Sequence, residues 1–279
     1  MIDPLLELTA EIRARASAPP REGVTQLLGC TEGYGLFRDA RGLHHRPLAH
    51  LGEGNQGPWD LSPLIDHTLL KPDATGAQVE VLCAEALAYG FASVCVNPLW
   101  VPLAAGCLRG SAVRTCTVVG FPLGASAFRA KALEAELAVN EGAQEVDMVL
   151  AIGAAKAGDW AAVQRDFAGL RKAVPAPGTL KVILETCLLS DVEKTRACEL
   201  ALEAGLDFVK TSTGFSTSGA TEADVALMRK AVGLAVGVKA SGGIRTYEVA
   251  LCMVQAGATR LGLSASVAVA QGGASAGTT

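Results

Sequence analysis

The sequence has little charge, few aromatic side chains and no local motif typical of a nucleotide or metal site. Only 19% of its 279 residues are charged and 5% are aromatic, whereas 50% are hydrophobic. This balance excludes a disordered chain, which combines low hydrophobicity with high net charge. The length is sufficient to bury a large core, either in one barrel-sized domain or in two smaller ones.

Several specific patterns are also absent. The net charge of −4 provides no general electrostatic attraction to nucleic acid, so we expect no nucleic-acid partner. The eight cysteines are scattered and form no CxxC pair, which argues against a disulfide scaffold or a structural zinc site. No GxGxxG motif follows the first predicted strand, so a dinucleotide-binding open sheet lacks its main support.

Residues 86–108 carry no Asp, Glu, Lys or Arg and are long enough to suggest a transmembrane helix. The run contains Pro98 and Pro102, which fit a strand, a loop and a helix start better than a continuous helix. The N-terminus mixes acidic with apolar residues and does not resemble a secretory signal. We therefore expect a soluble, cytoplasmic protein with no membrane partner.

Residues 1–58 differ from the rest of the chain and are predicted to form an N-terminal extension. A short amphipathic helix is expected over residues 4–16, before two prolines. The Gly-rich stretch 35–58 contains His44, His45 and His50 and is predicted to be a solvated loop, since no cysteine or suitably spaced carboxylate accompanies the histidines. The apolar stripe of the helix needs a partner surface, so we expect a homo-oligomer, a dimer or a tetramer.

From about residue 61, short β-branched runs alternate with helical stretches. The strands are predicted over residues 64–68, 92–96, 113–119, 145–150, 180–185, 207–211, 236–240 and 260–264. The helices are predicted over residues 76–89, 128–141, 160–173, 191–204, 222–232 and 247–255. This alternation is typical of an α/β fold, either a (β/α)8 TIM barrel or a doubly wound open sheet.

The charged residues inside the apolar strands favour the barrel, because a closed barrel brings polar side chains from several strands to one mouth. We predict the barrel over residues 59–271 and a flexible tail over residues 272–279, where the composition is rich in Gly, Ala and Ser.

Two lysines lie at the ends of apolar strands. Lys210 belongs to the strand predicted over 207–211, and Lys239 lies one strand–helix–strand unit later. A single buried lysine would be interpreted as the partner of a carboxylate, because an unpaired buried charge is costly. Two lysines on neighbouring strands indicate more, since a second ammonium lowers the pKa of the first and leaves a neutral amine to attack a carbonyl. The pair predicts Schiff-base catalysis.

Carboxylates occupy two further strands. Asp147 lies among apolar neighbours and serves either as a salt-bridge partner of the lysines or as part of a proton relay. Asp66 occupies the corresponding place in the first strand. His67 should point out of the barrel if Asp66 points in, and is predicted to have a packing or capping role.

Small residues follow the last three predicted strands, at 212–214, 241–243 and 264–266. Glycine lets the backbone approach an anion closely, and a helix N-terminus directs its amide groups at it. Barrel enzymes often bind phosphate after strands seven and eight. The sequence therefore predicts a phosphorylated substrate.

Seven segments in order resemble the deoxyribose-phosphate aldolase family, and the resemblance covers roughly residues 61–270. They are LIDHTLLKPDAT, FASVCVNPLWV, TVVGFPLGAS, EGAQEVDMVL, LKVILET, DFVKTSTGF and GVKASGGIRT. The resemblance implies a class I aldolase that reversibly cleaves 2-deoxy-D-ribose 5-phosphate to acetaldehyde and D-glyceraldehyde 3-phosphate, with no metal and no other cofactor. It implies that Lys210 forms the Schiff base, that Lys239 perturbs the amine of Lys210, and that Asp147 relays protons.

The resemblance also implies a set of substrate contacts. They are Asp66, Cys95, Thr213, Gly214, Gly242, Gly243 and Ser264. Asp66 would order water and the substrate hydroxyls, and Cys95 would lie near the acceptor aldehyde or serve only as a small buried hydrophobe. The chain departs from the family at Phe215, where some members carry lysine, and at Ala265, where serine is frequent. Phosphate preference is expected to be weaker as a result.

Two other functions remain open from the sequence. One is a different Schiff-base barrel enzyme, such as a transaldolase or a keto-acid aldolase, that uses the same lysine on another substrate. The other is a non-catalytic barrel that binds a sugar phosphate. The second is disfavoured by Lys210, Lys239 and Asp147 together, because binding alone gains little from a lysine poised for attack.

Overall fold

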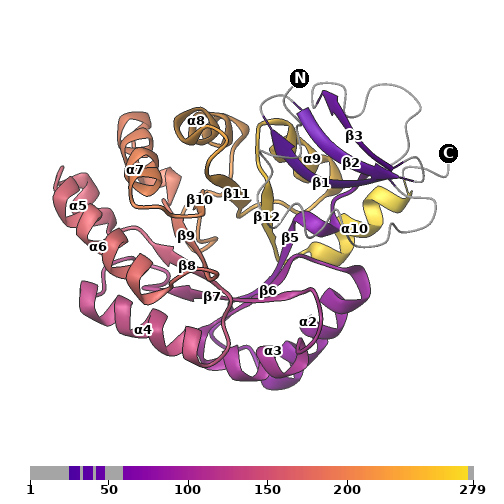
Figure 1. Cartoon of the computed structure of the whole chain (residues 1–279), viewed down its shortest axis with the longest axis horizontal. Coiled ribbons are helices and arrows are strands. Elements are labelled where there is room, and N and C mark those ends of the chain that lie inside the picture. The colour runs from indigo at the N-terminus through magenta and orange to yellow at the C-terminus, as the bar shows by residue number, and fades with distance from the viewer. Residues whose placement is uncertain (1–24, 32–33, 40–41, 48–58, 276–279) are drawn as a thin grey trace.

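The computed structural model describes residues 25–31, 34–39, 42–47 and 59–275. In this part of the chain, eight parallel strands close into a barrel and the helices lie outside them (Figure 1). The barrel strands are β5 (Ile65–Leu69), β6 (Ser93–Val96), β7 (Arg114–Val119), β8 (Glu145–Val149), β9 (Thr179–Ile183), β10 (Phe208–Lys210), β11 (Gly237–Ser241) and β12 (Arg260–Leu263). They pair in chain order, and β12 pairs with β5. The predicted (β/α)8 TIM barrel is therefore confirmed.

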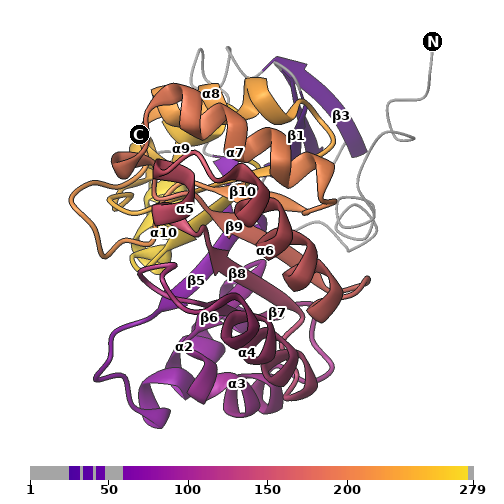
Figure 2. The ribbon, with the colours of Figure 1, turned by 90° about the vertical axis from the view of Figure 1, so that its left-hand side faces the viewer.

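The helices alternate with the strands. They are α2 (Gly76–Tyr89), α3 (Val101–Cys107), α4 (Phe128–Asn140), α5 (Ile152–Lys156), α6 (Trp160–Ala173), α7 (Asp191–Glu203), α8 (Glu222–Val232), α9 (Tyr247–Gln255) and α10 (Ser266–Ser275). Each of the six predicted helices begins at its predicted residue and ends within one residue of its predicted end. Figure 2, which faces α4, α6 and α7, shows this outer layer in front of the barrel strands.

Local capping explains why these boundaries could be predicted. Thr75 and Ser190 each form a capping box at the start of α2 and α7, in which the side chain accepts from the third backbone N–H of the helix. Thr221 and Thr246 cap α8 and α9 in the same way. At the other end of α2, Gly90 has φ 65°, a left-handed conformation that favours glycine.

The charge-free run 86–108 is divided among the end of α2, strand β6, a short 3-10 turn over Pro98–Trp100 and helix α3. This confirms the interpretation from its two prolines. Among the described residues, no helix combines the length and the apolar character needed to cross a bilayer.

The prediction of a loop over residues 35–58 is wrong for its first part. Strands β1 (Thr25–Thr31), β2 (Tyr34–Asp39) and β3 (Gly42–Pro47) form an antiparallel meander, and β1 also pairs with β4 (Trp59–Asp60). His44 and His45 lie in β3, opposite Phe37 and Leu36. The three strands pair along their length, so cross-strand pairing rather than a strong local strand pattern sets this structure. The helix predicted over 4–16 and His50 lie outside the described residues.

The small N-terminal sheet adjoins the C-terminal part of the barrel. The backbone N–H of Trp59 in β4 donates to the hydroxyl of Tyr247 in α9 at 2.8 Å, and Figure 1 shows the sheet on the side of α9 and α10. Helix α10 continues to Ser275, so the flexible tail predicted from residue 272 begins too early. The reason is packing: Gly272 lies so close to Tyr247 that an added Cβ would sit 3.0 Å from the tyrosine Cβ.

Candidate active site

The two lysines predicted to be catalytic lie side by side in the barrel. Lys210 is the last residue of β10 and is paired in register with Lys239 of β11. Asp147 is in β8 and Asp66 in β5, on other sides of the closed sheet. Lys210 is 3% exposed and the other three residues are fully buried. Closure of the barrel brings these four side chains from four strands into its interior.

One carboxylate oxygen connects both lysines. Lys210 Nζ lies 2.8 Å and Lys239 Nζ lies 2.7 Å from Asp147 Oδ2. Lys239 Nζ is also 2.5 Å from Asp66 Oδ2. The predicted catalytic residues thus form one continuous set of ion pairs, with Lys239 between two carboxylates.

The ion pairs outweigh the effect of burial on the pKa values of Asp147 and Lys239. Burial alone would raise the pKa of Asp147, but Lys181, Lys210 and Lys239 hold it well below its ordinary value. Burial would lower the pKa of Lys239, yet the carboxylates of Asp147 and Asp66 raise it above its ordinary value. Asp147 is therefore ionised and Lys239 protonated at neutral pH.

Three further charged residues complete the interior of the barrel and were not predicted as site residues. Lys181 Nζ lies 2.9 Å from Asp147 Oδ1 and 2.5 Å from Glu145 Oε2. Arg260 Nη1 lies 2.6 Å from Asp66 Oδ1 and 3.1 Å from Glu145 Oε2. The signal that singled out Lys210 and Lys239, a charge inside an apolar strand, also applies to Lys181 and Arg260.

A glycine makes room for one of the catalytic candidates. A Cβ at Gly262 in β12 would lie 3.0 Å from Lys239 Cε and 3.0 Å from Ser241 Cβ. An added Cβ would press on the lysine side chain, so glycine leaves Lys239 room to reach its carboxylates. Gly262 was not predicted as a site residue, because a glycine within a strand gives no hint of which side chain lies beside it.

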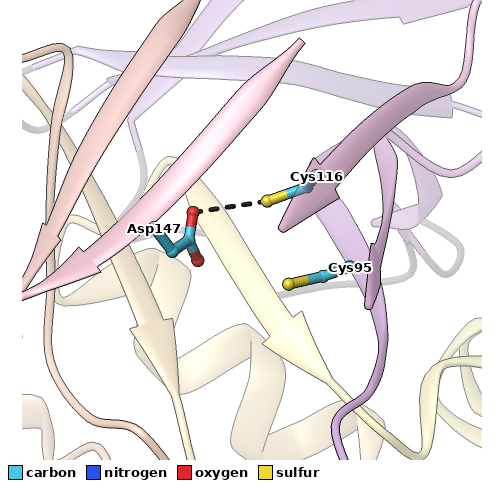
Figure 3. Close-up of side chains that lie close together, drawn as sticks. All are labelled: Cys95, Cys116 and Asp147. Carbon is cyan, nitrogen blue, oxygen red and sulfur yellow. Dashed lines mark hydrogen bonds between the residues drawn. The ribbon is translucent and has the colours of Figure 1, made fainter. Parts of the chain in front are cut away.

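Cys95 is buried inside the barrel, close to Asp147. Its sulfur, that of Cys116 and a carboxylate oxygen of Asp147 all lie within 4.8 Å of one another, and Cys116 Sγ is 3.4 Å from Asp147 Oδ1 (Figure 3). Two sulfurs and one oxygen could in principle ligate a metal. However, Lys181, Lys210 and Lys239 already engage both oxygens of Asp147, so the arrangement favours ion pairs with ammonium groups.

The glycines predicted to contact substrate have backbone conformations that favour glycine. Gly214, Gly242 and Gly243 have φ angles of 86°, 85° and 80°. The loops after β10 and β11 also approach closely, since a Cβ at Gly242 would lie 3.0 Å from Gly219 Cα. The Ala220 N–H donates to the carbonyls of Ser241 and Gly242, which ties the two loops together.

The remaining predicted contacts lie on the same end of the barrel. Ser264 is exposed just after β12, and Thr213 is buried in the turn after β10. Phe215, in the same turn, packs edge-on against Phe121 from the loop after β7, with ring centroids 5.2 Å apart. The loops at this mouth therefore combine glycine-rich backbone with an aromatic pair.

His67 points away from the barrel interior, as predicted from Asp66 pointing inward. Its ring nitrogens lie 2.9 Å from Ser266 Oγ and 2.7 Å from Glu85 Oε2, and its ring packs edge-on against Phe91. These contacts give His67 a packing role that joins β5 to α2 and to the start of α10.

The closed barrel and its buried lysines around a shared carboxylate are typical of barrel enzymes that use an amine nucleophile. Residues 62–277 match the DeoC/LacD family aldolase, and the chain belongs to this family.

Curated relatives cover most of the barrel. The chain is 55% identical over 213 residues to a protein of Geobacillus sp. (strain WCH70) named deoxyribose-phosphate aldolase, covering 76% of this chain and 96% of the relative. It is 57% identical over 212 residues to a protein of the same name from Listeria welshimeri, covering 76% and 95%. Among solved structures, the tetrameric deoxyribose phosphate aldolase from Aeropyrum pernix matches with a TM-score of 0.72 and 36% identity, covering 80% of this chain and 93% of that one.

Proposed function

We propose that the protein is a class I deoxyribose-phosphate aldolase in which Lys210 is the Schiff-base residue. It cleaves 2-deoxy-D-ribose 5-phosphate reversibly to acetaldehyde and D-glyceraldehyde 3-phosphate. The observation that carries the assignment of residues is the sharing of Asp147 Oδ2 by Lys210 and Lys239. Lys210 is the last residue of β10 and the less buried of the two lysines, at 3% exposed against 0% for Lys239, which favours its amine as the one that a substrate reaches.

The reaction begins when the amine of Lys210 attacks C1 of the open-chain aldehyde and forms a carbinolamine. Loss of water gives a protonated imine. The C2–C3 bond then breaks: its electron pair moves toward the imine to form an enamine, while the C3 hydroxyl loses its proton and becomes the aldehyde of glyceraldehyde 3-phosphate. Protonation of the enamine at C2 and hydrolysis of the imine release acetaldehyde and free Lys210.

Asp147 and Lys239 supply the proton transfers in this scheme. Asp147 is ionised and within hydrogen-bond distance of both lysines, so it can accept a proton from one and return it to the other. Lys239 is kept protonated by Asp147 and Asp66 and acts as the proton reserve. Asp66 holds Lys239 and, in this proposal, orders water and the substrate hydroxyls.

The outer loops bind the rest of the substrate. The backbone at Gly214, Gly242 and Gly243 and the start of α10 beside Ser264 receive the phosphate, because glycine backbone and a helix N-terminus favour an anion. Thr213 shapes the first of these turns. Cys95 lies near the acceptor aldehyde as a small apolar group.

The protein acts as a homo-oligomer in the cytoplasm under this proposal. The tetrameric state described for the relative from Aeropyrum pernix supports assembly. Light scattering on the full chain and on a chain lacking residues 1–58 measures whether the extension contributes; an equal subunit number in both would contradict that contribution.

Borohydride reduction in the presence of deoxyribose 5-phosphate, followed by peptide mapping, tests the catalytic assignment. We expect a stable adduct on Lys210. An adduct on Lys239 or Lys181 instead would overturn the assignment. Release of glyceraldehyde 3-phosphate, followed with a coupled dehydrogenase, tests the substrate separately, because trapping of other carbonyl compounds without this product would indicate a different Schiff-base reaction.

A further inference from the structure

Glu185 follows β9 at the mouth of the barrel and has an unusual backbone. Its φ and ψ angles are 57° and 64°, and among the described residues it is the one non-glycine residue with a positive φ. This left-handed region penalises any residue that carries a Cβ. Such strain is retained where the surrounding contacts hold the residue in place, and it often occurs at functional sites.

The carboxylate of Glu185 makes the contacts that hold it. It is 2% exposed, and it accepts the Thr213 N–H at 3.2 Å through Oε1 and the Thr213 hydroxyl through Oε2. Its own loop is also joined to this turn by the backbone, where the Thr186 N–H donates to the Thr211 carbonyl at 3.0 Å. Both donors of Thr213 are thus engaged by the carboxylate of Glu185.

The contact determines the shape of the turn that follows. Because the Thr213 hydroxyl donates its single proton to Glu185, a lone pair of Oγ1 is free to accept, and the Phe215 N–H donates to it at 3.1 Å. Gly214 lies between these two residues and is exposed at the mouth. Glu185 therefore fixes the conformation of residues 213–215 through Thr213.

We infer that Glu185 is a positioning residue for the phosphate end of the substrate, acting through Thr213 to hold the backbone of the 213–215 turn in its anion-binding shape. The inference rests on the proposed function. A glycine at this position would relieve the backbone strain but would leave Thr213 without its acceptor. Glycine is thus the substitution that separates the carboxylate from the backbone conformation.

The test compares Glu185→Gly and Glu185→Gln with the unaltered protein on two substrates, deoxyribose 5-phosphate and unphosphorylated 2-deoxyribose. Loss of a hydrogen bond to a charged group predicts that Glu185→Gly raises KM for the phosphorylated substrate about tenfold. We expect kcat and the KM for 2-deoxyribose to stay within about threefold, because the inference assigns this turn to the phosphate alone. Glu185→Gln keeps one acceptor oxygen and should restore part of the affinity.

A matched control is Glu193→Gln on α7. Glu193 accepts from the Ser190 N–H at 2.7 Å and pairs with Lys156, so its substitution weakens the far end of the same β9–α7 connection without reaching Thr213. In this variant, the ratio of the KM for deoxyribose 5-phosphate to the KM for 2-deoxyribose should equal that of the unaltered protein.

Binding of inorganic phosphate, measured by calorimetry, needs no turnover and separates this inference from the proposed reaction. Weaker phosphate binding by Glu185→Gly supports the positioning role even in a chain that cleaves no deoxyribose 5-phosphate. Unchanged phosphate binding, or an equal rise in KM for both substrates, would overturn it. Absence of cleavage by the unaltered protein would instead refute the proposed function.

Discussion

Two sets of buried charges in this protein differ in how many partners each group has. Outside the barrel, Lys131 of α4 pairs with Asp166 of α6, and Lys131 Nζ also donates to the Val149 carbonyl at 2.7 Å. Inside the barrel, Asp147 is shared by three lysines. All of these side chains are almost entirely excluded from solvent.

The number of partners decides whether burial determines the direction of the pKa shift. In the isolated pair, burial dominates and shifts both groups toward their neutral forms: the pKa of Lys131 is lowered and that of Asp166 is raised. In the barrel, the several opposite charges overcome burial and keep Asp147 and Lys239 charged. A closed pair joins two helices to the barrel, whereas a connected set of charges can pass a proton between members.

The largest expected effect distinguishes the two sets by activity. Lys239→Leu removes the proposed proton reserve, so kcat should fall by about 10²–10⁴-fold, the usual contribution of general acid–base catalysis. Asp66 and Asp147 keep Arg260 and Lys181 as partners, so the fold should persist. Steady-state cleavage of deoxyribose 5-phosphate measures the effect, and an unchanged kcat would remove Lys239 from the mechanism.

The second expected effect distinguishes the two sets of buried charges by the stability of the fold. Lys131→Met leaves the Asp166 carboxyl buried without its partner, and should lower the free energy of unfolding by about 3–5 kcal/mol. The double variant Lys131→Met with Asp166→Leu should recover most of this loss, because an apolar pair needs no compensation. Urea unfolding at pH 7 measures both, and kcat per folded molecule should not change. A large loss of kcat in the double variant would show that the pair is linked to the site.

A smaller effect concerns the loss of stability of the fold at acidic pH. Asp147 and Asp66 have folded-state pKa values below their ordinary value of 3.8, so the unfolded chain binds protons at these carboxyls before the folded chain does. Their contribution to stability is therefore complete above pH 5 and is lost as pH falls below about 4, by about 1.4 kcal/mol per pH unit for each carboxyl.

Asp147→Asn gives the control for this pH dependence. It should reduce the slope of stability against pH below about pH 4, and Asp166→Asn should not, because the pKa of Asp166 is raised rather than lowered. Thermal unfolding between pH 3 and pH 7 measures the slopes. Equal slopes in all three proteins would contradict the assigned directions.

The smallest expected effect is a change in KM caused by a substitution at the mouth of the barrel. Phe215→Lys places a positive charge in the turn beside Gly214, and an exposed charge pair should lower KM for the phosphorylated substrate by about twofold to fivefold. The gain should vanish at high salt and should be absent with 2-deoxyribose. Phe215→Met is the control, since it also removes the ring contact with Phe121 but adds no charge. An equal change in both variants would assign the effect to that contact.

Much of the barrel could be predicted because its signals are local. Capping at Thr75, Ser190, Thr221 and Thr246 fixes four helix starts within a few residues of sequence. The N-terminal meander was missed because its strands carry no strong period and are held by pairing across the sheet. The end of α10 was missed because the contact of Gly272 with Tyr247 joins residues that are distant in sequence.

The sequence by itself determined the order of strands and helices, the aldolase family and the presence of charges in strands that are otherwise apolar. Tertiary structure alone decided that Lys210 and Lys239 meet at a single oxygen of Asp147, across 63 and 92 residues of chain. It also decided that Gly262 leaves space for Lys239 and that Glu185 holds Thr213. The physical reason is that periodicity and capping act within a few residues, whereas charges in a barrel find their partners only when the sheet closes.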